Sequence, residues 1–114
     1  MTQDDLIAAG YSRFPTGPNS DKPYAACAYQ RAIYDGDKKA YFVQVYYYDV
    51  MMFPNGSTNG PFFTADANLY PPEPRRDWLT LEIHQVGEMT VAEMEAIFFA
   101  AWTKLGCVHD LHNN

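Results

Sequence analysis

The pattern of hydrophobic and polar positions is clearest between Trp78 and Val86, where the two kinds of residue alternate. An alternation with a period of two predicts a strand with one buried face and one solvated face. The expected faces are Leu79, Leu81 and Ile83 on one side, and Thr80, Glu82 and His84 on the other. Such a strand is typical of an antiparallel sheet that is covered on one side only.

A second alternating pattern spans Tyr24–Tyr34 and Ala40–Val50, two segments rich in β-branched and aromatic residues. Asp35-Gly36-Asp37-Lys38 lies between them and is typical of a tight hairpin turn, because glycine adopts positive φ without steric cost. We therefore predict an antiparallel hairpin. In its second strand we expect Tyr41, Val43, Val45 and Tyr47 on one face and Phe42, Gln44, Tyr46 and Tyr48 on the other.

Helical patterns occur near both ends of the chain. Thr2 can cap a short helix, and Gly10 is placed to stop it. Near the other end, Thr90 and Glu93 form a capping box. A broad apolar face follows at helical spacing: Val91, Met94, Phe98, Ala101, Trp102 and Leu105. We expect this longer helix to end at Gly106.

The remaining segments complete the predicted order of elements. Phe62–Thr64 could start a third, shorter strand, and the proline-rich stretch Tyr70–Asp77 predicts an extended connection. We predict a single α+β domain over residues 1–114, with a short flexible tail at 107–114. Its antiparallel sheet has three to four strands, and a short N-terminal helix and a longer C-terminal helix pack on one face.

Composition and charge narrow the class of function. The 114 residues carry a formal net charge of −6, which argues against direct nucleic-acid binding by phosphate neutralisation. No apolar run approaches the ~20 residues of a membrane span, and the first residues do not resemble a secretory signal. The two cysteines are too few for a disulfide scaffold. We therefore expect a cytoplasmic protein with no membrane contact.

Two small groups of residues have types that could carry chemistry. His84 next to Glu82 on the polar strand face could act as a general base, or could be an ordinary surface histidine. Cys107, His109 and His112 are residue types that ligate metals, but a second ligand pair is missing, so a frayed polar terminus explains them as well. We expect no catalytic residues and no cofactor.

The aromatic residues suggest binding instead. The chain has nine tyrosines, seven phenylalanines and two tryptophans, and many lie on the predicted hairpin. Cross-strand aromatic pairs can stabilise a small sheet, whereas exposed tyrosines are typical of interfaces. We favour an interface, because helices on one face would leave aromatic residues displayed on the other. The candidate partner-binding residues are Tyr24, Tyr34, Tyr41, Tyr46 and Tyr48.

Three stretches together resemble a broad group of short phage and prophage proteins. They are Leu6-Ile7-Ala8-Ala9-Gly10-Tyr11, the segment Lys39–Asp49, and the ending from Thr90 to Gly106. The resemblance covers most of the chain in order. It implies an α+β fold and a mobile-element setting in a bacterial host cell, and it supplies no catalytic residues.

The sequence thus leads to three hypotheses. The first is a small acidic, non-enzymatic binding or accessory protein of phage or prophage type. It would act through contact with a protein partner or as a homodimer, and could inhibit a host nucleic-acid-binding or defence protein. The second is a secretion- or assembly-type chaperone. The third is a small enzyme with a pocket near His84 and Glu82.

Overall fold

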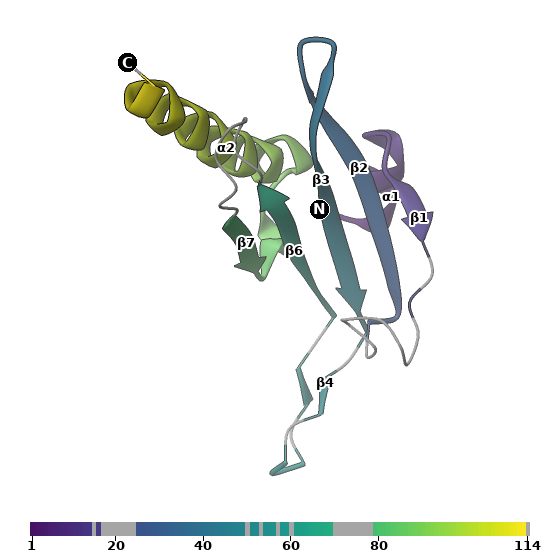
Figure 1. The fold of residues 1–114 in the computed structure, drawn as a ribbon. Helices are drawn as coiled ribbons and strands as arrows, with labels where there is room; N and C mark the ends of the chain where they lie inside the picture. Colours follow the sequence, from purple (N-terminus) through teal and green to yellow (C-terminus); the bar gives the residue numbers. More distant parts are fainter. Residues whose placement is uncertain are drawn as a thin grey trace.

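The structure is a computed structural model, and it describes residues 1–14, 16, 25–49, 51–52, 54–56, 58–59, 61–69 and 79–113. Within these ranges, the side chains of residues 38, 51–52, 58–59, 79 and 106–113 are not described. The predicted α+β arrangement is confirmed: an antiparallel sheet carries a short N-terminal helix and a longer C-terminal helix (Figure 1). The sheet has five strands, slightly more than the three to four that we predicted.

The main sheet is an antiparallel meander in the order β1-β2-β3-β6-β7 (Figure 1). Its strands are β1 (Ser12–Phe14), β2 (Cys27–Asp35), β3 (Lys38–Tyr48), β6 (Phe62–Leu69) and β7 (Leu79–His84). Between β3 and β6 the chain forms a separate two-stranded ribbon from β4 (Met51–Met52) and β5 (Thr58–Asn59). The predicted hairpin is thus the centre of the sheet, with β2 and β3 paired from Cys27–Tyr47 to Asp35–Lys38.

Local signals position both helices. α1 (Gln3–Ala8) begins at a capping box in which Thr2 and Asp5 bond reciprocally, and Gly10 follows it at φ +94°. α2 (Val91–Asn113) begins at the predicted box, where the Thr90 hydroxyl accepts from the Glu93 N–H and the Glu93 carboxylate accepts from the Thr90 N–H. A short 3₁₀ helix, η1 (Val86–Glu88), links β7 to α2.

The end that we predicted for the C-terminal helix was wrong, and the structure extends one possible strand and adds another. α2 continues through Gly106 to Asn113, so the residues that we predicted to be a flexible tail, up to Asn113, are helical. An interior glycine costs a helix only about 1 kcal/mol relative to alanine, which does not by itself end it. The possible strand at Phe62–Thr64 extends to Leu69, and the three-residue strand β1 is too short to give a recognisable pattern.

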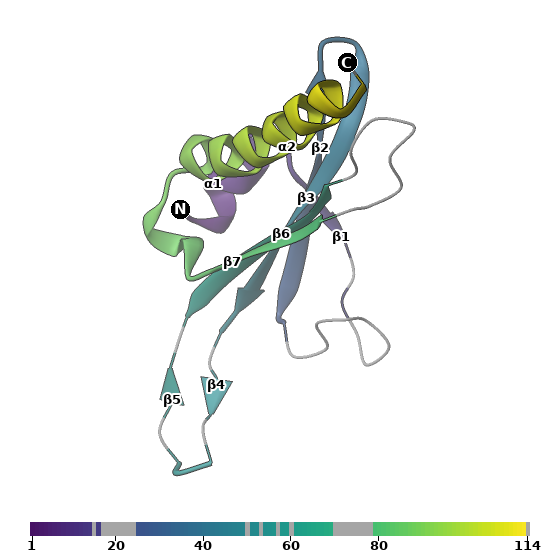
Figure 2. The same cartoon turned by 60° about the vertical axis from the view of Figure 1, so that its left-hand side comes forward.

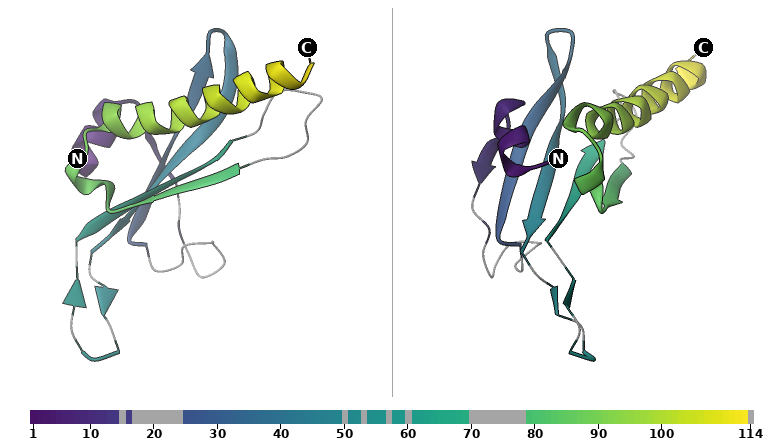
Figure 3. Two further views of the ribbon diagram at one scale, coloured as in Figure 1. Left: turned by 90° about the vertical axis from the view of Figure 1, so that its left-hand side faces the viewer. Right: turned by 180° about the vertical axis from the view of Figure 1, so that it is seen from behind.

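The main core lies between the sheet and the two helices, which lie on the same side of the sheet (Figures 2 and 3). We call this side the helix-covered face. Leu6 of α1 and Met94 and Phe98 of α2 are fully buried in one cluster with β3 and β6 residues such as Val43 and Ala65. The alternation predicted for β3 and β7 is therefore confirmed on this face.

The opposite face of the sheet, which we call the open face, carries a second and smaller cluster. Its buried members are Ala25, Ala28, Tyr46 and Tyr48, with Phe14 and Phe62 packed against them. The Tyr48 and Phe62 rings stack with centroids 4.7 Å apart, and the Phe14 and Tyr46 rings meet edge to face at 6.0 Å. Aromatic residues on the open face are therefore largely used for packing within the chain.

Candidate functional site

The structure buries three of the five tyrosines that we predicted to bind a partner. Tyr41, Tyr46 and Tyr48 are only 4%, 6% and 9% exposed, so they do not form the displayed aromatic face that we expected. Tyr41 lies in the main core, and the other two lie in the open-face cluster beneath neighbouring aromatic rings. Tyr34 is 57% exposed and remains a candidate. Tyr24 lies outside the described residues.

Exposed Tyr34 borders a groove of about 430 Å³ between β2 and the first turns of α2. The strand contributes Arg31, Ala32, Ile33 and Tyr34, and the helix contributes Ala92, Glu95, Ala96 and Phe99. We call these eight residues the β2–α2 surface. Phe99 is 37% exposed, so two exposed aromatic residues are among those that line the groove, together with small and aliphatic residues and one ion pair.

A charged network holds the two walls of this groove together. The Arg31 Nη1 donates to both carboxylate oxygens of Glu95 at 2.8 and 2.6 Å, and the Tyr11 hydroxyl donates to the same carboxylate at 2.8 Å. Burial, followed by the hydrogen bond to Glu95, raises the pKa of Tyr11 well above its usual range. Tyr11 therefore stays protonated and donates to Glu95, which ties the segment between α1 and β1 to α2.

A chain of aromatic rings supports Phe99 from within. The Phe99 and Trp102 rings lie 5.9 Å apart, and the Trp102 and Tyr41 rings 6.3 Å apart. The Tyr41 hydroxyl and Trp102 Nε1 are buried and have no hydrogen-bond partner among the described residues. Burial, and then the Glu95 carboxylate, raise the pKa of Tyr41 to about 12. Tyr41 is thus a buried residue beneath Trp102, which in turn contacts Phe99.

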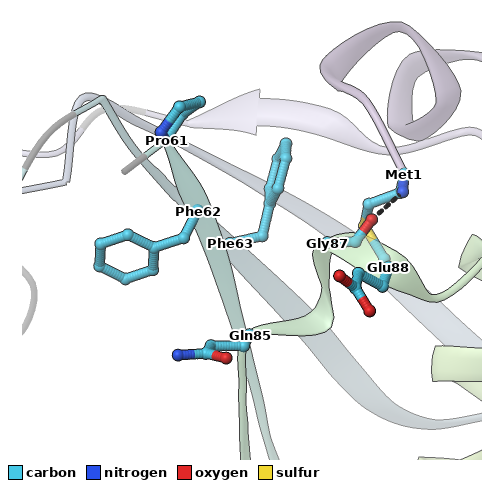
Figure 4. A pocket seen from close by; sticks show the side chains of 7 residues that line it. All are labelled: Met1, Pro61, Phe62, Phe63, Gln85, Gly87 and Glu88. Carbon is cyan, nitrogen blue, oxygen red and sulfur yellow. Dashed lines mark hydrogen bonds between the residues drawn. The ribbon is translucent and has the colours of Figure 1, made fainter. Parts of the chain in front are cut away.

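A second cavity, of about 470 Å³, opens at the other end of the sheet (Figure 4). It lies where β6 meets η1 and is lined by Met1, Pro61, Phe62, Phe63, Gln85, Gly87 and Glu88. The Met1 nitrogen donates to the Gly87 carbonyl at its rim (Figure 4). Glu88 is its one carboxylate among the described lining residues, which include no Ser, Thr, Cys, His or Lys side chain.

The candidate base His84 lies with Glu82 on the open face of β7. The two side chains are 73% and 45% exposed, and the His84 Nε2 lies 3.9 Å from the Glu82 Oε2. Neither residue lines the two cavities described above. This geometry is that of a solvated surface pair, which contributes little to stability and offers no enclosed site.

The candidate metal ligands lie near the end of α2. The backbone of Cys107, His109 and His112 is helical, and their side chains lie outside what the structure describes. Within the side chains that it does describe, no group of three His, Cys, Asp or Glu residues is placed to hold a metal ion. Among the same residues, no helix is long and apolar enough to cross a membrane.

No protein-family model, no curated protein and no solved structure significantly matches this chain. The resemblance to short phage and prophage proteins therefore stays a prediction from the sequence.

Sequence reasoning identified Tyr34 but not the rest of the β2–α2 surface. Phe99 lies off the apolar face that we predicted for this helix, so the helical pattern did not mark it. The signal that could have located the groove is the small-residue spacing of Ala92 and Ala96 next to Phe99 on one helix face. That spacing does not say which strand lies opposite.

Proposed function

We propose that this chain is a small acidic, non-enzymatic binding protein that acts through protein–protein contact, and that its contact region is the β2–α2 surface. One observation carries the proposal: the exposed aromatic residues Tyr34 and Phe99 both line an open groove between β2 and α2. Aromatic residues around a preformed apolar depression are the usual anchors of protein interfaces.

Rigidity strengthens this assignment, since ordering a mobile surface lowers affinity. Arg31 and Glu95 fix the distance between the strand and the helix, and Trp102 backs the exposed ring of Phe99. These contacts favour a groove that is already formed before a partner docks.

The proposal retains the phage or prophage setting, which is supported by the sequence resemblance alone. The formal net charge of −6 favours a basic partner, such as a host nucleic-acid-binding or defence protein. In that case the charge would speed association, and the apolar groove would supply the contact that holds the complex.

A second candidate function is a secretion- or assembly-type chaperone. It is favoured by the position of the groove beside the part of β2 that β1 does not cover, because an extended peptide can add to a strand edge as a further strand. If this protein bound an isolated extended peptide from the partner as tightly as it bound the folded partner, that result would favour the chaperone function over the first.

The test is a comparative capture experiment with the full chain. Wild-type protein and the variants Tyr34→Lys, Phe99→Lys and Phe42→Lys would be used to capture proteins from a bacterial lysate, followed by quantitative mass spectrometry. Phe42 is the matched control, because it is an exposed aromatic residue (42%) of the same hairpin and does not line the groove.

We expect a partner whose recovery falls by about tenfold or more with Tyr34→Lys and Phe99→Lys and is unchanged with Phe42→Lys. Recovery of the same proteins with all four baits would contradict the proposal. So would the retention of no protein above the tag alone.

A further inference from the structure

Helix α2 has an exposed stripe on a side that is turned away from both the sheet and the groove. Its members recur at intervals of four, three and four residues and are all exposed: Glu93, Ile97, Ala100 and Lys104. Because a helix turns by about 100° per residue, this spacing aligns the four side chains along one side of the helix. Ile97 is 41% exposed, and none of the four lines the β2–α2 surface.

The two ends of this stripe carry opposite charges. The Glu93 carboxylate accepts the Thr90 N–H through Oε1, which leaves Oε2 for a second partner. The hydrogen bonds with Thr90 lower the pKa of Glu93, so this carboxylate is ionised at neutral pH. Lys104 makes no ion pair within the part of the chain that the structure describes. The stripe therefore offers one anion and one cation, with only apolar side chains between them.

α2 is also longer than the sheet beneath it. Its last turns project past the strands, as Figures 1 and 3 show from different sides. A helical segment of a few turns is marginal in water unless it packs against something. The sheet alone therefore does not account for the stability of the whole helix.

We infer that a second copy of this chain packs on the stripe, with the two α2 helices antiparallel about a two-fold axis midway between Glu93 and Lys104. In this register Glu93 of each copy is level with Lys104 of the other, so two equivalent ion pairs form. The antiparallel direction also aligns the two helix dipoles favourably. The inference goes beyond the proposed function, because the stripe and the β2–α2 surface lie on different sides of α2.

The apolar residues of the stripe match in the same register. Ile97 of each copy is level with Ala100 of the other, so a large side chain meets a small one. Ala96 is exposed next to them. Small residues at a helix contact allow the helix axes to approach to the lower end of the usual separation of about 8–10 Å. The stripe is therefore complementary to itself in shape as well as in charge.

Charge favours a second copy over a basic partner at this stripe. The formal net charge of −6 opposes contact between two copies over most of their surfaces. The stripe is an exception, since its one acidic and one basic residue balance. A basic partner would meet Lys104 as a like charge, whereas a copy related by the two-fold axis satisfies both ends of the stripe.

The dimer would leave both grooves accessible. Phe99 lies two positions after Ile97 and hence about 200° around the helix, on nearly the opposite side. The last turns of each α2 would lie along the beginning of the other, because residue 106 of one copy is level with residue 91 of its partner. The two sheets would lie outside the paired helices, and each copy would keep its own β2–α2 surface.

The first experiment measures association. Sedimentation equilibrium of the full chain at low ionic strength, up to millimolar concentrations, should show a dimer. Ile97→Lys should raise the dissociation constant by about tenfold or more. Ile7→Lys is the matched control, since it makes the same change at an exposed position of α1 (53%), and should raise the constant by less than about twofold. A monomer at every concentration would overturn the inference, and so would a dimer that Ile97→Lys leaves intact.

The second experiment tests the register through the charges. Glu93→Gln preserves the capping box, because glutamine caps as glutamate does. In the wild-type chain this change removes the attraction to Lys104 and should raise the dissociation constant by about threefold. In a Lys104→Glu background the same change removes a repulsion and should lower the constant. An effect of the same sign in both backgrounds would overturn the register.

The two proposals can fail separately. A monomeric chain whose captured partner is still lost with Tyr34→Lys and Phe99→Lys would reject the dimer and keep the proposed function. A dimer that is sensitive to Ile97→Lys but retains no partner would reject the proposed function and keep the dimer.

Discussion

Two buried tyrosines offer a direct test of how hydrogen bonding stabilises this core. Tyr11 and Tyr41 are 3% and 4% exposed and lie in the same cluster. The Tyr11 hydroxyl donates to the Glu95 carboxylate at 2.8 Å, whereas the Tyr41 hydroxyl has no partner among the described residues. The same substitution, tyrosine to phenylalanine, should therefore have opposite effects at the two positions.

The expected magnitudes follow from these contacts. A hydrogen bond to a charged acceptor contributes about 1.5–3 kcal/mol, and Glu95 keeps its bonds to Arg31 when Tyr11 is replaced. We therefore expect Tyr11→Phe to lower the free energy of unfolding by about 1–2 kcal/mol. An unsatisfied buried hydroxyl costs about 1–3 kcal/mol, so Tyr41→Phe should be neutral or should stabilise the fold by up to about 1 kcal/mol.

The assay is urea unfolding at pH 7, followed by tryptophan fluorescence and by far-ultraviolet circular dichroism. Coincident transitions would justify a two-state analysis, and equal m-values would show that the variants unfold to the same extent. Equal losses of stability in the two variants would refute the reasoning. A loss above about 1 kcal/mol for Tyr41→Phe would do the same, because it would mean that this hydroxyl is bonded in solution.

Three further predictions concern the core, the hairpin and alkaline stability. Phe98→Ala, at a fully buried position, should cost about 3–5 kcal/mol, whereas Phe99→Ala on the exposed side of α2 should cost less than about 1 kcal/mol; both are measured by urea unfolding. Gly36 has φ +64°, so Gly36→Ala should cost about 1 kcal/mol in the same assay, and no loss would show that the turn can change its conformation. Burial raises the folded-state pKa of Tyr11 and Tyr41 above the unfolded value of 10.0, for Tyr41 to about 12. The stability from Tyr41 is complete below pH 10 and is lost as the pH rises from 10 through 12, and the loss from Tyr11 also begins above pH 10. The unfolding free energy should therefore fall over this range, and less steeply in Tyr41→Phe.

Local patterns in the sequence were enough to predict most of the elements. Period-two alternation predicted the faces of β3 and β7, because a residue's side of a strand depends only on its position in the strand. The capping box at Thr90 and the glycine at position 36 predicted where α2 and the hairpin turn begin. These features need only a few neighbouring residues, so they can be seen without knowing the fold.

The expectation that Tyr46 and Tyr48 are displayed on the sheet surface was wrong because it used only the neighbouring residues in the sequence. Alternation correctly separates Tyr46 and Tyr48 from the helix-covered face, but it does not say what lies over the other face. Phe14 and Phe62 cover them, and both belong to strands whose positions in the sheet the sequence pattern did not reveal. Alternation alone places Tyr46 and Tyr48 on a face that could be exposed to solvent. The order of the strands brings Phe14 and Phe62 over that face, so both tyrosines are buried.

The sequence by itself determined the α+β class, the acidic charge and the alternation of each long strand, because these follow from composition and from periodicity along the chain. The tertiary structure alone decided the candidate site. Glu95 lies 64 positions from Arg31 and 84 from Tyr11, and the groove exists only because these residues converge. The free edge of β2 was likewise decided by the fold, since it depends on where β1 stops, and pairing between distant segments is set by the packing of the whole sheet.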